Sequence, residues 1–100
     1  MVDFCISAVR YDEKKQHITY VKVHECQTTS QGWGLGPART VSRAFVADLI
    51  RMNKASFETV VKVENNKVRH GAHVHVIDDV YLSTDRNSTK RDNLSNLPEF

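Results

Sequence analysis

The sequence has no apolar run long enough to cross a bilayer, and no secretory leader is evident. Met1-Val2-Asp3 leads directly into a segment with the pattern of a strand. A transmembrane helix needs about 20 consecutive apolar residues, and a secretory signal needs an apolar stretch behind a basic start. We therefore expect no membrane association and a cytoplasmic location.

Cysteine is scarce. The chain contains two cysteines, Cys5 and Cys26, each in an expected strand. A bridge between them requires those strands to pair, whereas the missing leader favours a reducing compartment, where disulfides rarely persist. We therefore expect two reduced, half-buried thiols. For the same reason the sequon Asn87-Ser88-Thr89 is expected to be a turn and not a glycosylation site.

A strong excess of one charge is also missing. The formal net charge of +2 is too small to indicate a nucleic-acid partner by itself. The content of 40% hydrophobic and 26% charged residues is ordinary for a globular protein and argues against global disorder. A chain of 100 residues without an internal repeat or a linker predicts one domain, residues 1–100, with one core.

No catalytic motif stands out. Neither cysteine has a recognisable activating partner, no nucleophile elbow occurs, and the carboxylate pair Asp78-Asp79 fits a turn. A domain this small without an obvious site is more often a binding protein than an enzyme. We expect no cofactor, and a small hydrolase or metal enzyme is the third of three hypotheses.

Alternation and helical spacing predict the first half of the fold. Residues 4–9 and 18–23 flank a charged turn, which predicts a β-hairpin over residues 4–25. Thr40 or Ser42 can cap a helix of about 12 residues, which Asn53-Lys54 ends. Its expected apolar stripe is Val41, Phe45, Leu49 and Met52, widened by Val46 and Ile50.

Further strands are predicted after this helix. Residues 57–63 alternate, Asn65-Asn66 is typical of a tight turn, and a return strand is expected over 68–77 with a bulge at Gly71. A last strand is expected at 80–82. The predicted fold is therefore α+β in the order β-β-α-β-β-β, an antiparallel sheet of about five strands with one amphipathic helix on one face.

The last fifth of the chain carries a family resemblance. Tyr81-Leu82-x-Thr84, Asp92-Asn93-Leu94 and Leu97-Pro98 together resemble the closing signature of the DUF3892-type family, a small prokaryotic and phage family of unknown function. The resemblance implies a fold and a prokaryotic or phage origin, and it supplies no catalytic residues. From the residues themselves, we expect Leu94 and Leu97 to pin the tail to the core, while Asp92 and Asn93 bond to local backbone.

The segment Gly32-Trp33-Gly34-Leu35-Gly36 is expected to be a loop that leads into the helix. A helix N-terminus attracts anions, glycines let the backbone approach them, and Arg39 and Arg43 add forked donors. Trp33 could stack on a base. The spacing matches neither a Walker loop nor a dinucleotide fingerprint, and the alternative is a flexible connector with Trp33 filling the core. With a basic tail, the candidate ligand-binding residues are Trp33, Gly34, Gly36, Arg39, Arg43, Arg86, Lys90 and Arg91.

Two patterns are weak metal signals. His73 and His75 share a face of the expected strand, near His70, and could begin a metal site with His24 or Cys26. The alternative, a solvated row of polar side chains, is preferred. Residues 85–92 alternate oxygen side chains as a calcium loop does, but the required Gly and Glu are missing. No metal is expected.

The sequence leaves two main functions open. The first is a non-enzymatic protein that binds an anionic ligand, either a nucleotide-type small molecule or a nucleic-acid backbone. The second is a protein–protein interaction module, such as a phage-encoded inhibitor of a host defence complex. Unprotected sheet edges also predict self-association into a homo-oligomer.

Overall fold

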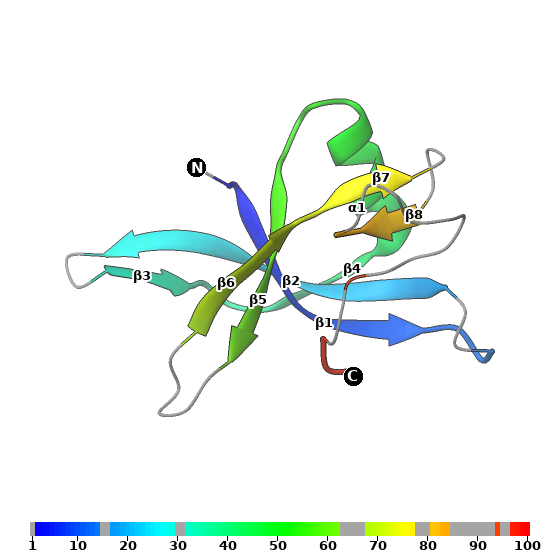
Figure 1. The fold of residues 1–100 in the computed structure, drawn as a ribbon, viewed down its shortest axis with the longest axis horizontal. Coiled ribbons are helices and arrows are strands. Elements are labelled where there is room, and N and C mark those ends of the chain that lie inside the picture. The colour runs from blue at the N-terminus through cyan, green and yellow to red at the C-terminus, as the bar shows by residue number, and fades with distance from the viewer. Residues whose placement is uncertain are drawn as a thin grey trace.

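The computed structural model describes residues 2–14, 17–29, 32–62, 68–77, 81–84, 94 and 97–100. Figure 1 shows the elements along the chain. They are β1 (Phe4–Tyr11), β2 (Ile18–Thr29), β3 (Gly32–Leu35), β4 (Arg39–Ser42), α1 (Arg43–Arg51), β5 (Phe57–Lys62), β6 (Val68–His73), β7 (His75–Ile77) and β8 (Tyr81–Ser83).

The main sheet has six strands and is mixed. Its order is β3-β2-β1-β5-β6, β4 also pairs with β2, and β7 and β8 form a separate two-stranded sheet (Figure 1). The β1–β5 pair is parallel, whereas the other pairs are antiparallel. The expected α+β class and the helix are confirmed, but the antiparallel sheet of about five strands and its strand order are wrong. A parallel pair needs a crossover, and here β2, β3, β4 and α1 lie between β1 and β5 in the chain.

The predicted hairpin of β1 and β2 is present and contains two bulges. Ile6 pairs with Val23 and Ala8 with Lys22, so Ser7 is an extra residue on β1. Ile6 and Val9 are both buried, at 0% and 1% exposure, although they lie three positions apart. Because side chains alternate along a strand, two residues three positions apart lie on the same face only where an extra residue lies between them. The same holds at the second bulge of the hairpin, where the extra residue is on β2 between the buried Ile18 and Val21.

The glycine-rich segment is a strand and not a loop. β3 runs antiparallel to the end of β2, with Leu35 beside Cys26 and Gly34 beside Gln27. The Gly36 N–H then donates to the Glu25 carbonyl at 2.9 Å. Main-chain bonds to β2 order this segment, although its sequence carries no alternation of apolar side chains.

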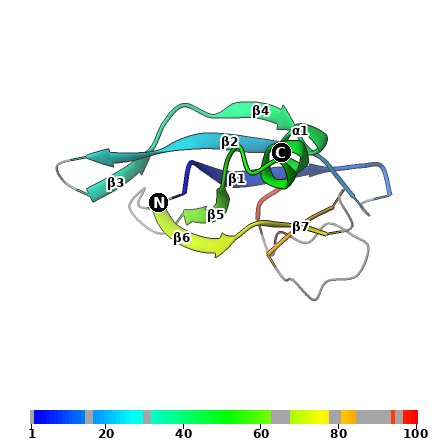
Figure 2. The same ribbon diagram turned by 90° about the horizontal axis from the view of Figure 1, so that it is seen from above.

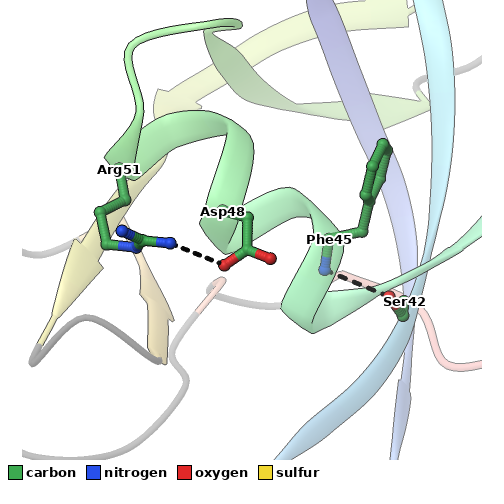
Figure 3. A network of polar contacts seen from close by, with 4 residues as sticks. All are labelled: Ser42, Phe45, Asp48 and Arg51. Carbon is green, nitrogen blue, oxygen red and sulfur yellow. Dashed lines mark hydrogen bonds and ion pairs between the residues drawn. The ribbon is translucent and has the colours of Figure 1, made fainter.

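Helix α1 is capped at both ends. Ser42 is its N-cap and accepts a hydrogen bond from the Phe45 N–H at 3.2 Å, and Arg51 pairs with Asp48 at 3.1 Å on the exposed side (Figure 3). At the other end Asn53 has a φ of 56°. The Asn53 and Lys54 N–H groups close a Schellman motif onto the last carbonyls, which confirms that these two residues end the helix.

The buried face of α1 differs from the expected stripe. Val46 and Ala47 are buried, whereas Phe45 and Met52 are each 54% exposed. Leu49 is partly buried against the core. The helix contacts β2 and β4 on one side and β7 and β8 on the other, and Figure 2 shows it nearly end-on at this position. Two packing surfaces, rather than one sheet face, therefore decide which side chains are covered.

The tail closes the core as the sequence predicts. Leu94 is fully buried in the cluster that includes Val9 and Leu82, and Leu97 is partly buried against it. Val9 also anchors the chain end, because its N–H donates to the Pro98 carbonyl at 2.9 Å and its carbonyl accepts from the Phe100 N–H at 3.0 Å. The expected roles of Asp92 and Asn93 fall outside the described residues.

The return strand is divided at Val74, which is buried and separates β6 from β7. The bulge expected at Gly71 is confirmed, because β6 advances three positions, from His73 to His70, where β5 advances two, from Glu58 to Val60. There the Thr59 hydroxyl accepts the Ala72 N–H at 2.9 Å. The expected turns at Asn65-Asn66 and Asp78-Asp79 lie outside the described residues.

Candidate functional site

The face of the β1–β2 hairpin that points away from the core is rich in polar side chains. Ile6 of β1 and Val21 and Val23 of β2 face the core, so their neighbours face the opposite side. The bulge adds Ser7 to that opposite side, beside Ala8. These outward residues are Cys5, Ser7 and Arg10 on β1, and Tyr20, Lys22, His24 and Cys26 on β2.

A disulfide joins Cys5 to Cys26 at one end of this face, with a Cα–Cα separation of 6.0 Å. The expectation of reduced thiols is therefore wrong for this structure. Cys5 pairs with His24 across the hairpin, so Cys26, two positions further on, is its diagonal neighbour on the same face. The register of the hairpin brings the two sulfurs together.

Next to the disulfide, a serine, a histidine and a backbone carbonyl form a chain of hydrogen bonds. The Ser7 Oγ lies 2.7 Å from the His24 Nε2. The His24 Nδ1 lies 2.9 Å from the Gly36 carbonyl oxygen. Ser7 and His24 are half-buried. Three segments, β1, β2 and the residue after β3, thus fix one imidazole ring.

Two cations and an aromatic ring border the same face. The Arg10 Cζ lies 4.5 Å and the Lys22 Nζ 4.8 Å from the centre of the Phe100 ring, within the range of cation–π attraction. The Lys22 ammonium also donates to the Thr40 Oγ1 at 2.9 Å, and the Arg10 Nε donates to the Phe100 carbonyl at 3.3 Å. These contacts hold the chain end across the hairpin.

A cavity of about 370 Å³ lies between the hairpin and the tail. One part of its wall is polar and the other is apolar. The polar wall comes from Ser7, Lys22 and His24, and the apolar wall comes from Ala8, Ala38, Val61, Leu97, Pro98 and Phe100.

The arginines expected to flank the helix start point to different places. Arg43 is the first residue of α1, and its Nε donates to the Ile18 carbonyl of β2 at 3.1 Å. Arg39 is exposed and donates to the Ala38 carbonyl at 3.3 Å. Because β4 is extended, the three residues from Arg39 to the N-cap Ser42 span about 10 Å.

The glycines are also distant from the helix start. Gly36 lies beside Glu25 on β2, whereas Ser42 lies beside Tyr20. Five residues of strand separate these positions, a span of about 17 Å. Gly34 is half-buried within β3. The glycines and the helix N-terminus therefore do not converge on one ligand.

Of the remaining candidate ligand-binding and metal-binding residues, some lie outside the part of the chain that the structure describes. Trp33 belongs to β3, but its side chain is not among the described ones, and Arg86, Lys90 and Arg91 lie outside the described residues. The rings of His73 and His75 lie side by side, with centres 4.8 Å apart. In the described part of the chain, no group of three or more His, Cys, Asp or Glu side chains is placed to hold a metal ion.

The family comparison assigns the chain. The family model described as "Protein of unknown function (DUF3892)" matches residues 5–98. The chain belongs to the DUF3892 family. No curated protein and no solved structure matches it. Within the described residues, no helix of this DUF3892 protein is long and apolar enough to cross a membrane.

Sequence reasoning did not identify Ser7 and His24 as partners. The sequence held one signal of the bulge that positions Ser7. The apolar residues Ile6 and Val9, both buried in the structure, lie three positions apart, which implies an extra residue between them. The pairing of Ser7 with His24, and the carbonyl of Gly36 beside the ring, depend on how three strands of this DUF3892 protein are registered. Neither contact has a local sequence pattern.

Proposed function

We propose that this DUF3892 protein binds a small molecule that carries an anionic group and an apolar part. The supporting observation is the cavity beside the tail, whose lining includes Lys22 together with the apolar residues Leu97, Pro98 and Phe100. Its volume of about 370 Å³ falls within the range of small-ligand sites. The proposal keeps the anionic ligand expected from the sequence and moves it from the glycine segment to the hairpin face.

The charges around the cavity favour an anion. An ammonium group has three N–H donors, and one of those on Lys22 is directed to Thr40. A carboxylate or phosphate can take a charge-assisted hydrogen bond from this group, while the apolar wall covers the rest of the ligand. A cavity of this size suits a small molecule better than a nucleic-acid backbone, which needs an extended basic groove.

Calorimetric titration with hexanoate and with adenosine monophosphate tests this proposal. We expect at least one of the two anions to bind and to bind more weakly as salt is added. The variant Lys22→Met should lose about tenfold or more in affinity, since hydrogen bonds to charged groups are worth about 1.5–3 kcal/mol. The exposed Lys54 provides the matched control Lys54→Met, which should bind as the wild type does. Equal affinity of the two variants would contradict the proposal.

A protein–protein role is the second proposal, and one observation favours it. Phe45 of α1 and its C-cap Met52 are each 54% exposed. They lie seven positions apart and so on the same side of the helix, and an exposed apolar patch is typical of a contact surface. This second proposal includes an interaction with a host defence complex, a prokaryotic or phage origin and a cytoplasmic location.

A further inference from the structure

We propose that Ser7 is a nucleophile activated by His24, and that the cavity hydrolyses esters of small carboxylic acids. The inference uses the cavity of the proposed function and adds a reaction to it. Its basis is the chain of contacts from the Ser7 Oγ through the His24 ring to the Gly36 carbonyl, at 2.7 Å and 2.9 Å.

The carbonyl determines which nitrogen carries the proton. A backbone carbonyl oxygen only accepts hydrogen bonds, so the His24 Nδ1 must be the protonated nitrogen that donates to Gly36. In the neutral ring the Nε2 then has a lone pair, and the Ser7 hydroxyl donates to it. This is the protonation state that nucleophile, base and orienting group require in serine hydrolysis.

The backbone around both residues holds this arrangement in place. Ser7 is the extra residue of the β1 bulge, and bulges commonly redirect a side chain next to an active site. The Gly36 N–H is bonded to the Glu25 carbonyl at 2.9 Å, which anchors to β2 the residue whose carbonyl orients the ring. The Cys5–Cys26 disulfide joins the strands beside His24.

The rest of the cavity fits the acyl part of an ester. Leu97, Pro98 and Val61 line it together with Ser7, so an apolar acyl chain can lie against them while its carbonyl carbon faces the Ser7 Oγ. Lys22 lines the same cavity. A cation at this position stabilises the negative charge that develops on the carbonyl oxygen.

The reaction balances without any further reagent except water. The Ser7 Oγ forms a bond to the carbonyl carbon and its proton passes to the His24 Nε2. The ester C–O bond breaks, and the leaving alkoxide takes the proton from Nε2 to become an alcohol. Water then attacks the acyl-serine and gives its proton to Nε2. As the acyl–Oγ bond breaks, that proton returns to Ser7 and the carboxylic acid is released.

Covalent labelling tests the nucleophile directly. The wild-type protein is incubated with a fluorophosphonate probe and, separately, with p-nitrophenyl butyrate, and adducts are located by peptide mass spectrometry. We expect the fluorophosphonate on Ser7 and release of nitrophenol above the rate without protein. Ser7→Ala should abolish both signals. His24→Gln, which removes the base, should slow labelling about a hundredfold or more.

Two controls separate chemistry from folding. His17→Gln changes a half-buried histidine outside the cavity and should label at the wild-type rate. Each variant is checked by its thermal midpoint. If His24→Gln does not fold, the position of the adduct in the wild type still decides whether Ser7 is the nucleophile. Labelling that misses Ser7, or labelling of Ser7 at equal rates in the wild type and a folded His24→Gln, overturns the proposal.

The binding and the reaction can fail independently. Binding of hexanoate or adenosine monophosphate to wild type and to Ser7→Ala, with no adduct on Ser7, would refute the hydrolase inference and leave the binding proposal standing. An adduct on Ser7 that depends on His24, with neither anion bound, would refute the anion-binding proposal and support the inference.

Discussion

Gly71 of β6 lies directly against Thr59 of β5. A Cβ at this position would meet the Thr59 hydroxyl and come within 2.9 Å of the Thr59 carbonyl oxygen. That hydroxyl cannot simply move aside, because it accepts the Ala72 N–H at 2.9 Å. We therefore predict that Gly71→Ala lowers the free energy of unfolding by about 1–3 kcal/mol, the usual cost of overpacking. Urea unfolding of the two proteins measures the difference.

Gly34 supplies a matched control for this prediction. A Cβ built there meets no heavy atom within 4 Å, so Gly34→Ala should leave the urea midpoint nearly unchanged. If both glycine variants lose the same stability, the close approach at Gly71 is not the cause.

At the scale of the helix, Asn53 sustains the C-terminal cap. Its φ of 56° lies in the left-handed region, which asparagine and glycine tolerate better than residues such as alanine. We predict that Asn53→Ala destabilises the protein by about 1 kcal/mol and that Asn53→Gly is neutral or stabilising. Thermal unfolding checks the order of the three proteins. Alanine that is as stable as glycine at this position would count against the cap.

The hairpin carries the prediction about its disulfide. Cys5 and Cys26 are separated by 21 positions. Closing a loop of this size lowers the entropy of the unfolded chain and thereby stabilises the folded state by about 3 kcal/mol. The double variant Cys5→Ser with Cys26→Ser should therefore unfold at a lower urea concentration than the oxidised wild type.

Alkylation under native, non-reducing conditions checks the state of the cysteines. The purified protein should not react with iodoacetamide until a reductant is added. Two alkylated cysteines before reduction would show that the bond is not formed, and would restore the expectation of reduced thiols in a cytoplasmic protein.

At the scale of the whole molecule, the open sheet predicts self-association. β6 and β3 end the main sheet, and unpaired strand edges are ready to add further strands. Phe45 and Met52 offer a second surface on α1. Sedimentation velocity should show a concentration-dependent dimer. Phe45→Lys with Met52→Lys tests the helix surface, and a monomer in the wild type at all concentrations would refute the prediction.

The sequence by itself determined the features that depend on local periodicity and capping. The hairpin of residues 4–25, the helix ended by Asn53, the burial of Leu94 and the adjacency of His73 and His75 all follow from this information. Alternation and helical spacing are properties of a single segment, because they reflect which side of that segment meets the core.

Only the tertiary structure decided the features that depend on how segments meet. The parallel pairing of β1 with β5, the glycine strand β3 and the exposure of Phe45 belong to this group. So do the Cys5–Cys26 bond and the contacts of His24 with Ser7 and Gly36. The exposure of Phe45 depends on the two surfaces that α1 packs against. The other features require a particular register between strands, and a shift of one residue would turn these side chains to the opposite face.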